Sequence, residues 1–310
     1  MKQTLLLWYL GNSLVWDSVG VFAAGSGVWG DASDQFSWPQ DMFIDETGTI
    51  YVADYYNHRI QKWLPNASTG STVAGITGIS ASTSSNTTLL SWPWSIFVRS
   101  NTMYISDNLN RILIWQIGAL SGTILPGSTT LGFIRKIFVD SNGNIYAISS
   151  TYAKVMMWTS SSTNYTILTH TNGTGYSSSQ LINPYGFFVD TTEKILYIAN
   201  TGAHTIISWP FNGTTGSIVF GWNSTFGPYD YLLYSPQDIT FDKNGNLYIA
   251  DTNNHRILLL CQNPPTNIAR TIFIPNIGSP ICIHLDSDMN LYVLGTASYV
   301  VKKFALIKHN

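Results

Sequence analysis

The sequence predicts an all-β fold, a six-bladed β-propeller of four-stranded antiparallel blades whose ring is closed by a strand from the N-terminal part of the chain. Three observations predict it. A three-stranded antiparallel pattern occurs six times at intervals of 42 to 53 residues, a fourth strand follows five of the copies, and one orphan strand precedes the first copy. A sheet of this size cannot bury both of its faces alone, so neighbouring copies must pack together, and repeats of this length are typical of propeller blades.

The fifth copy shows the pattern most fully. Its first strand, 238–241, alternates in character, and the following Asn244-Gly245 pair supplies the positive backbone angles of a short hairpin turn. The second strand, 247–250, alternates again. A turn rich in Asp and Asn then leads to the third strand, 255–260. The unit is therefore an antiparallel meander.

The other copies align on three recurring residues. A tyrosine in the second strand recurs as Tyr51, Tyr104, Tyr146, Tyr197, Tyr248 and Tyr292. A proline before the first strand is missing only from the third copy and recurs as Pro39, Pro93, Pro184, Pro236 and Pro280. An aspartate closes the first strand except in the second copy, which has Arg99, and it recurs as Asp45, Asp140, Asp190, Asp242 and Asp286. These recurring residues predict six blades.

The fourth strand of each blade is expected after the third. The candidate segments are 72–74, 122–125, 165–168, 217–220 and 271–274. The sixth copy ends near Phe304, which leaves little room for a fourth strand of its own. The orphan strand Val21–Ala24 resembles the fourth strand of the first copy. We expect it to pair with the sixth copy, because an unpaired sheet edge favours aggregation.

Two segments carry a family resemblance. Residues 53–63 (ADYYNHRIQKW) and 250–260 (ADTNNHRILLL), each following a Pro-x-Asp strand, resemble NHL repeats. The resemblance covers roughly residues 21–304 and is most specific in copies one and five. It implies a six-bladed propeller, in agreement with the count of copies.

Length and composition predict one domain. The chain has 310 residues, of which 45% are hydrophobic, so one closed ring uses nearly all of it. We expect the propeller at residues 21–310 and a separate N-terminal segment at 1–20. The start of that segment, MKQTLLLWYL, fits either the remnant of a signal peptide or an N-terminal strand or artefactual gene start. No apolar run approaches the roughly 20 residues needed to span a bilayer.

The charge balance argues against nucleic acid as a partner. Only 10% of the residues are charged and the net charge is -2, so no electrostatic footprint for phosphates is present. The RNA-binding role of some cytosolic NHL proteins is therefore not expected. Aromatic residues make up 14% of the chain, and the loops are rich in Asn, Ser, Thr and Gly.

Sequons and cysteines bear on the cellular compartment. Six N-glycosylation sequons lie between the copies, outside the core strands, at Asn66, Asn86, Asn164, Asn172, Asn212 and Asn223. Their placement predicts an extracellular, secreted glycoprotein. Cys261 and Cys282, the only cysteines, leave two alternatives open: a disulfide across the loop between blades five and six, or two small buried apolar residues.

Chemistry is expected at one mouth of the central channel, where the first strands converge. The residues there are Gln40-Asp41, Trp94-Ser95, Arg135-Lys136, Tyr185-Gly186, Gln237-Asp238 and Ile281-Cys282. We take Asp41, Trp94, Lys136, Tyr185 and Asp238 as candidate ligand-binding residues. Asp41 and Asp238 occupy equivalent positions and could hold calcium. We favour a structural role, accepting hydrogen bonds from backbone amides of the adjacent blade, because no third carboxylate joins them.

Three histidines, His58, His204 and His255, share one position at the start of the third strand. Peptidyl-hydroxyglycine lyases, which are similar to NHL propellers, hold zinc with channel histidines, one of them in a Pro-His-Asp segment. Here glutamine replaces that histidine, in Pro39-Gln40-Asp41 and Pro236-Gln237-Asp238. We therefore expect no metal. If one were bound, its ligands would come from Asp41, Asp238, His58 and His255.

Two classes of function remain. The first is a non-catalytic, monomeric, secreted propeller that needs no cofactor and binds a protein or glycan through its rim loops, with Trp94, Tyr185 and segment 222–234 as contacts. The second is a metal-dependent channel enzyme, a zinc lyase of the type above or a calcium-dependent lactonase. Nucleophile and nucleotide motifs such as GxSxG, HExxH and the P-loop are missing from the sequence.

Overall fold

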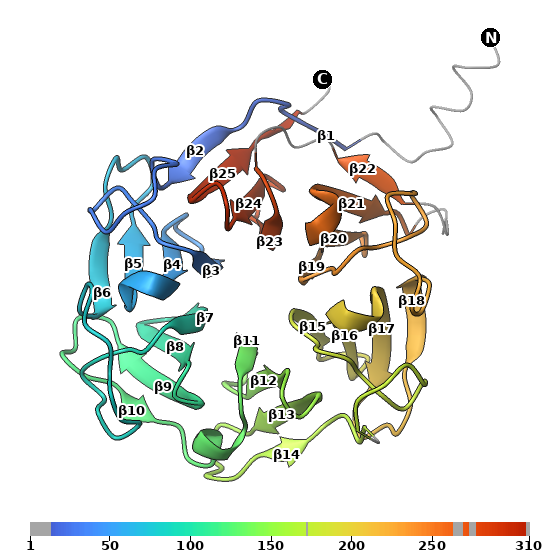
Figure 1. Cartoon of the computed structure of the whole chain (residues 1–310), viewed down its shortest axis with the longest axis horizontal. Helices are drawn as coiled ribbons and strands as arrows, with labels where there is room; N and C mark the ends of the chain where they lie inside the picture. Colours follow the sequence, from blue (N-terminus) through green and yellow to red (C-terminus); the bar gives the residue numbers. More distant parts are fainter. Residues whose placement is uncertain (1–13, 172, 263–268, 273–276, 308–310) are drawn as a thin grey trace.

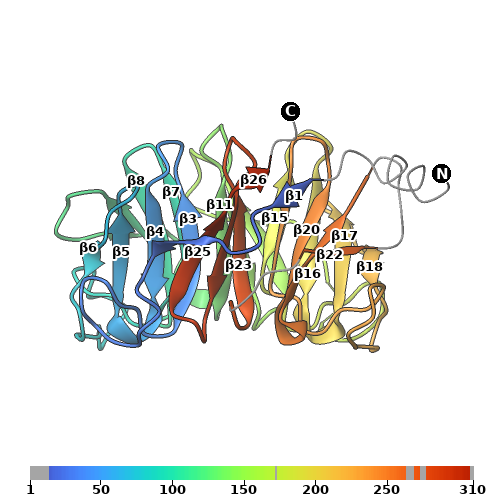
Figure 2. The same cartoon turned by 90° about the horizontal axis from the view of Figure 1, so that it is seen from above.

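The computed structural model describes residues 14–171, 173–262, 269–272 and 277–307. They form six four-stranded antiparallel sheets, placed as blades around a central axis (Figure 1). Figure 2 shows the same ring from the side, with loops at both faces. The predicted fold class is confirmed. Among the described residues no helix has the length and apolar character to cross a membrane.

Blades 1 to 3 follow the chain in order, from the channel outward. Blade 1 contains β3 (Pro39–Ile44), β4 (Ile50–Asp54), β5 (Arg59–Trp63) and β6 (Ser71–Gly75). Blade 2 contains β7 (Pro93–Arg99), β8 (Thr102–Asp107), β9 (Arg111–Gln116) and β10 (Thr123–Ile124). Blade 3 contains β11 (Ile134–Val139), β12 (Ile145–Ser149), β13 (Lys154–Trp158) and β14 (Thr166–Ile167).

Blades 4 to 6 complete the ring. Blade 4 contains β15 (Phe187–Asp190), β16 (Ile195–Asn200), β17 (Thr205–Pro210) and β18 (Ser217–Gly221). Blade 5 contains β19 (Asp238–Phe241), β20 (Leu247–Asp251), β21 (Arg256–Leu260) and β22 (Arg270–Ile272). Blade 6 contains β23 (Pro280–Leu285), β24 (Leu291–Gly295), β25 (Val300–Phe304) and, from the start of the chain, β2 (Val21–Ala24). Single turns of 3-10 helix are η1 (Tyr55–Asn57), η2 (Ser128–Thr130), η3 (Thr201–Ala203) and η4 (Thr252–Asn254).

The N-terminal part of the chain closes the ring, as expected. Strand β2 pairs antiparallel with β25, and Val21 faces Lys303. A further short pair, β1 (Val15–Trp16) with β26 (Leu306–Ile307), extends this seam. The indole of Trp16 donates a hydrogen bond to the Met289 carbonyl at 2.8 Å. The packed structure therefore begins before residue 21.

The expected fourth strands are present at the expected places. Strands β6, β10, β14 and β18 overlap the four segments predicted for blades 1 to 4. In blade 5 the strand begins at Arg270, and residues 273–274 of the predicted segment lie outside the described residues.

The hydrophobic core is divided among the gaps between blades. Six clusters of buried residues each join two adjacent blades, including the cluster that joins blade 6 to blade 1. The largest buried side chains include four tryptophans near the ends of third strands, Trp63, Trp115, Trp158 and Trp209. Each blade thus buries its faces only against its neighbours.

A buried ion pair fixes the loops at one face of three blades. In blade 1, Arg59 Nε lies 2.8 Å from Asp54 Oδ2. The rest of the Arg59 guanidinium donates to the carbonyls of Asp31, Ala32 and Gln35 in the incoming loop. The pairs Arg111–Asp107 and Arg256–Asp251 repeat the arrangement in blades 2 and 5.

The Arg111 pair generates a stability prediction. Replacing Arg111 with alanine leaves the fully buried Asp107 without its counterion and leaves the carbonyls of Ser84 and Leu89 without a donor. Breaking a buried pair in this way costs about 3–5 kcal/mol. We expect Arg111→Ala to lower the free energy of unfolding by that amount in urea denaturation. Arg99→Ala, which removes a half-buried arginine that donates to the Ser141 carbonyl and has no ion-pair partner among the described residues, is the control and should cost far less. Equal losses would contradict this role.

Candidate functional site

The mouth of the channel is shaped by β-bulges. At the start of the first strand, the register shifts between Pro39 and Asp41, and equivalent shifts occur in blades 2, 3 and 6. A bulge inserts one extra residue and changes the direction of neighbouring side chains. In these four blades both residues of the predicted pair can therefore reach the channel, although strict alternation would direct one of them away.

Two tiers of side chains result. The outer tier consists of Gln40, Trp94, Arg135, Tyr185, Gln237 and Ile281, and the inner tier consists of Asp41, Ser95, Lys136, Gly186, Asp238 and Cys282. All but Ser95 and Cys282 line one pocket of about 20 Å³. The structure thus brings together all five candidate ligand-binding residues. The pocket has room for one water-sized group.

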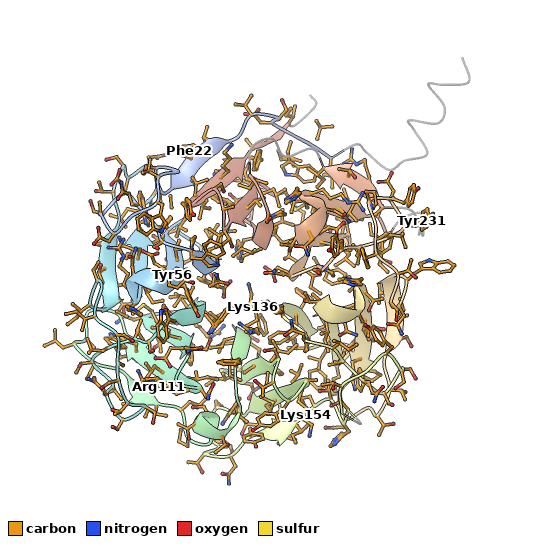
Figure 3. All side chains as sticks on the ribbon, viewed as in Figure 1. Phe22, Tyr56, Arg111, Lys136, Lys154 and Tyr231 are labelled. Atoms are coloured by element: carbon orange, nitrogen blue, oxygen red, sulfur yellow. The ribbon has the colours of Figure 1, made fainter. Side chains whose placement is uncertain are left out.

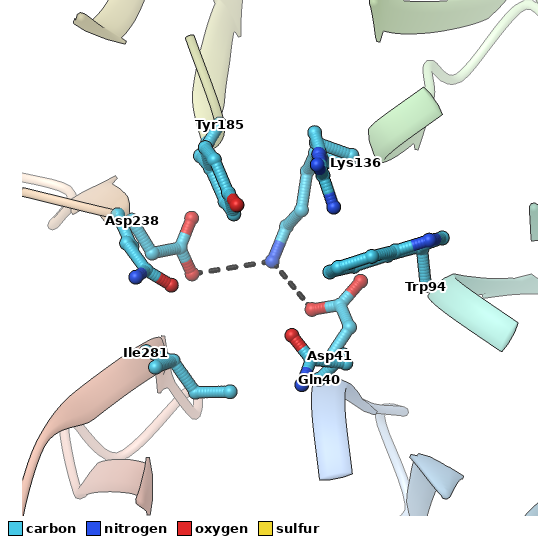
Figure 4. A pocket seen from close by; sticks show the side chains of 10 residues that line it. Gln40, Asp41, Trp94, Lys136, Tyr185, Asp238 and Ile281 are labelled. Carbon is cyan, nitrogen blue, oxygen red and sulfur yellow. Dashed lines mark hydrogen bonds and ion pairs between the residues drawn. The ribbon is translucent and has the colours of Figure 1, made fainter. Parts of the chain in front are cut away.

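Lys136 joins the two channel aspartates. Its side chain extends to the centre of the ring (Figure 3). Lys136 Nζ lies 2.7 Å from Asp41 Oδ1 and 3.1 Å from Asp238 Oδ2 (Figure 4). Burial opposes the charge of this ammonium, but Asp238 and Asp41 outweigh burial and raise the pKa of Lys136 well above its usual value. The lysine is therefore charged and occupies the position between the carboxylates.

The aspartates also hold neighbouring blades together. Asp41 Oδ2 accepts hydrogen bonds from Ser95 Oγ at 2.7 Å and from the Ile96 amide at 3.1 Å in blade 2. Asp238 Oδ2 accepts one from the Ile283 amide of blade 6 at 3.1 Å. These bonds match the structural role favoured from the sequence. Among the described residues, no group of three or more His, Cys, Asp or Glu side chains is arranged to hold a metal ion.

Cys282 belongs to the same cluster. Its thiol lies 3.1 Å from Asp41 Oδ1 and 3.3 Å from Lys136 Nζ. Cys261 and Cys282 are both free, so the disulfide alternative does not form in this structure. The repeat alignment places Cys282 at this mouth, but its contacts with Asp41 and Lys136 are not expected from the sequence.

An aromatic belt lies one step deeper in the channel. Two residues beyond the inner tier, on the same side of each first strand, are Phe43, Phe97, Phe138, Phe188, Thr240 and His284. The ring centroids of Phe43 and Phe97 are 4.6 Å apart, and those of Phe97 and Phe138 are 5.4 Å apart. His284 continues the belt at 5.9 Å from Phe43. These rings narrow the channel beneath the lysine.

The three repeated histidines lie away from the aspartates. His58, His204 and His255 each follow a 3-10 turn in the left-handed conformation. The Nδ1 atoms of His58 and His204 accept hydrogen bonds from the Trp92 and Ser235 amides at 3.1 Å. His255 Nδ1 lies 3.2 Å from Ser279 Oγ. These side chains connect each blade to the loop that enters the next one.

The exposed aromatic residues gather on one face. We call it the mouth face: it carries the channel mouth, the turns from second to third strands and the loops between blades. Of the eleven exposed aromatic side chains among the described residues, only Phe22 lies elsewhere; the others are Trp29, Trp38, Tyr56, Phe133, Tyr152, Tyr176, Trp222, Phe226, Tyr229 and Tyr231. Four belong to predicted segment 222–234, and Trp222 is 66% exposed.

The sequons divide between the two faces. Asn66, Asn164 and Asn212 are exposed in loops between third and fourth strands, on the face opposite the mouth. Asn86 and Asn223 are half-buried in loops of the mouth face. The Asn86 side-chain oxygen accepts a hydrogen bond from the Thr88 amide, and the Asn223 side-chain nitrogen donates one to the Tyr176 carbonyl of the preceding loop between blades. Asn172 lies outside the described residues.

The channel histidine generates a prediction of pH dependence. Burial, and then the charge of Lys136, lowers the pKa of His284 to about 4 from a usual value of 6.5. Between these values the unfolded chain binds a proton that the folded chain does not. The contribution of His284 to the free energy of unfolding is therefore fully present above pH 6.5 and is lost as the pH falls toward 4. The loss between pH 7 and pH 5 is about 2 kcal/mol.

We expect His284→Phe, which restores the residue found at this position in four other blades, to remove that part of the pH dependence. The measurement is urea unfolding at pH 7 and pH 5. The matched control is His170→Gln in an exposed loop. This variant should show the same difference in the free energy of unfolding between pH 7 and pH 5 as the wild type. If His284→Phe shows the same difference in the free energy of unfolding between the two pH values as the wild type, the pKa of His284 is not lowered and the prediction is wrong.

Comparisons with known proteins support the fold. The NHL repeat model matches residues 36–63 and 233–258, and no curated protein matches the sequence. Among solved structures, an auxiliary nutrient binding protein from Bacteroides ovatus has a TM-score of 0.69 at 15% identity, over 96% of this chain and 78% of that chain. A gluconolactonase from Xanthomonas campestris has a TM-score of 0.65 at 12% identity, over 96% of this chain and 98% of that chain.

A virginiamycin B lyase from Staphylococcus aureus has a TM-score of 0.58 at 14% identity, over 90% of this chain and 83% of that chain. At such identities the likeness to solved structures shows the fold alone. The matched repeats include the Asn-His-Arg turns of blades 1 and 5, with the ion pairs described above. With six blades closed by an N-terminal strand, the chain is an NHL-repeat six-bladed β-propeller.

Proposed function

We propose that this propeller is a secreted, non-catalytic binding protein that holds a protein or glycan partner on its mouth face. The observation that carries the proposal is the gathering of ten of the eleven exposed aromatic side chains on that face. Aromatic residues supply large contact areas at low conformational cost and are enriched in recognition surfaces. Scattered single apolar residues would need no explanation, but a one-sided collection does.

The loops that carry these residues are held by the body of the protein. The ion pairs of blades 1 and 5 anchor the carbonyls of the loops that contain Trp29 and Tyr229. A recognition surface on fixed loops loses less conformational entropy when it binds. The loops between blades are also nearly free of charge: within the described residues they carry only Asp31, Asp34 and Asp230. An uncharged aromatic surface suits a partner of low charge.

The channel mouth is filled by side chains, which favours a binding protein over a channel enzyme. The pocket at its mouth holds about 20 Å³, the ammonium of Lys136 lies between the two aspartates, and the aromatic belt lies beneath. A substrate could not enter between the tiers without displacing these side chains. The metal-dependent alternative would also require a cation to replace Lys136, because the aspartates already share it.

The structural neighbours are compatible with either class, since they include a nutrient-binding protein, a gluconolactonase and a lyase. Secretion is supported by the sequons. The three exposed ones lie opposite the aromatic surface, where glycans would leave the mouth face open.

The first test is partner capture. Protein secreted from a eukaryotic host would be applied to glycan and protein arrays. The variant Trp222→Ser with Tyr229→Ser removes two rings that are 66% and 62% exposed. We expect at least about a tenfold loss of affinity for captured ligands, since aromatic anchors commonly carry more than 1 kcal/mol each.

The matched control is Leu64→Ser with Leu120→Ser, which removes two exposed apolar residues from the opposite face. It should bind as the wild type does. Equal binding by both double variants, or no ligand on either array, would contradict the proposal.

The second test is glycan occupancy in the same secreted protein. We expect Asn66, Asn164 and Asn212 to be glycosylated because they are exposed, and Asn86 and Asn223 to be largely unmodified because they are half-buried and the amide nitrogen of Asn223 donates to the Tyr176 carbonyl. Peptide mapping after enzymatic release of glycans in heavy-oxygen water measures each site. Occupancy confined to Asn86 and Asn223, or no glycan at all, would count against this orientation.

A further inference from the structure

The guanidinium of Arg135 stacks against aromatic rings at the channel mouth. Its guanidinium lies between two aromatic rings, with Cζ 3.7 Å from the centroid of Trp94 and 4.6 Å from that of Tyr185. A third ring, Phe133, lies at 5.4 Å. Stacking of this kind is favourable for a cation and fixes the plane of the guanidinium.

Stacking does not satisfy the hydrogen-bonding groups of Arg135. The N–H donors of a guanidinium point outward in its plane, whereas the rings cover its faces. Nε donates to Ser150 Oγ at 2.9 Å. Nη1 is buried and has no hydrogen-bond partner, and within the described ranges no carboxylate forms an ion pair with Arg135. An unsatisfied buried donor on a charged group is costly.

The nearby carboxylates are committed elsewhere. Asp41 accepts hydrogen bonds from Lys136, Ser95 and two amides, and Asp238 accepts from Lys136 and the Ile283 amide. The inner tier therefore holds two carboxylates around one ammonium, and its hydrogen-bonding groups are used within that tier. Arg135, in the outer tier, forms no ion pair with these carboxylates, and its Nη1 donor lacks an acceptor among the described residues.

We infer that Arg135 is a recognition residue for a carboxylate group of the ligand, which it binds through its free Nη edge at the channel mouth. The small pocket has room for one oxygen atom of such a group, while the aromatic loops around it contact the rest of the ligand. A planar carboxylate matches the donor fork of arginine. This inference rests on the proposed function and specifies which end of the partner meets the channel. An acidic sugar and a peptide C-terminus supply the same chemistry.

The test uses paired probes and NMR of the indole and arginine N–H signals near Trp94. Methyl glucuronide is compared with methyl glucoside, and an acetylated dipeptide acid with its amide. We expect one of the acids to bind about 10- to 100-fold more tightly than its neutral counterpart, as befits a hydrogen bond to a charged group. The pair that shows the difference identifies the source of the carboxylate.

Arg135→Gln should abolish the preference for the acid, and Arg135→Lys, which keeps the charge but loses the fork, should reduce it. Arg99→Gln changes the net charge equally at the opposite face and should leave binding unchanged. Thermal unfolding confirms that the variants are folded. Equal binding of acid and neutral probes, binding of neither acid, or a preference that survives in Arg135→Gln would overturn the inference.

Partner capture on the arrays separates the two proposals. If captured ligands are lost in Trp222→Ser with Tyr229→Ser but bind Arg135→Gln normally, the carboxylate site is wrong while the binding function stands. If the acid probe requires Arg135 but nothing is captured on the arrays, the site stands and the rim-loop function fails.

Discussion

No blade of this protein can bury both faces of its sheet alone, and the whole architecture follows from that constraint. The six hydrophobic clusters lie between blades, so each blade is stable only when both neighbours are present. An open ring would expose two apolar faces. Strand β2, paired with β25, closes the ring by joining the beginning of the chain to its end.

The same construction separates a stable body from a surface that is open to a partner. Blade-to-blade packing uses all four strands and also includes buried residues of the incoming loops, such as Phe36, Leu90 and Leu233, which fix those loops to the body. The Asp–Arg pairs then hold the loops of the mouth face by their carbonyls, which leaves the side chains of those loops directed outward. Sequence can vary there at small energetic cost, and this is where the exposed aromatics lie.

The channel shows how a closed ring brings distant residues into one cluster. Asp41, Lys136 and Asp238 are about 100 residues apart in sequence, yet Lys136 Nζ contacts both carboxylates within 3.1 Å. Gly186 contributes to this cluster by being small, since a Cβ there would lie 2.5 Å from Asp238 Oδ1. The result is an inner tier in which one ammonium lies between two carboxylates, beneath an outer tier that carries the Arg135 guanidinium.

The sequence by itself determined the number of blades, the closing strand and the residues that surround the channel mouth, because repeat spacing and strand alternation are local properties. Only the tertiary structure decided which ion pairs and hydrogen bonds those residues form with one another. Three features depend on where six strands meet around one axis: the bulges in blades 1, 2, 3 and 6, the position of Lys136 between the aspartates, and the unpaired donor of Arg135. Contacts across that axis leave no periodic signal in the chain, so sequence reasoning identified the ring but not the bonds within it.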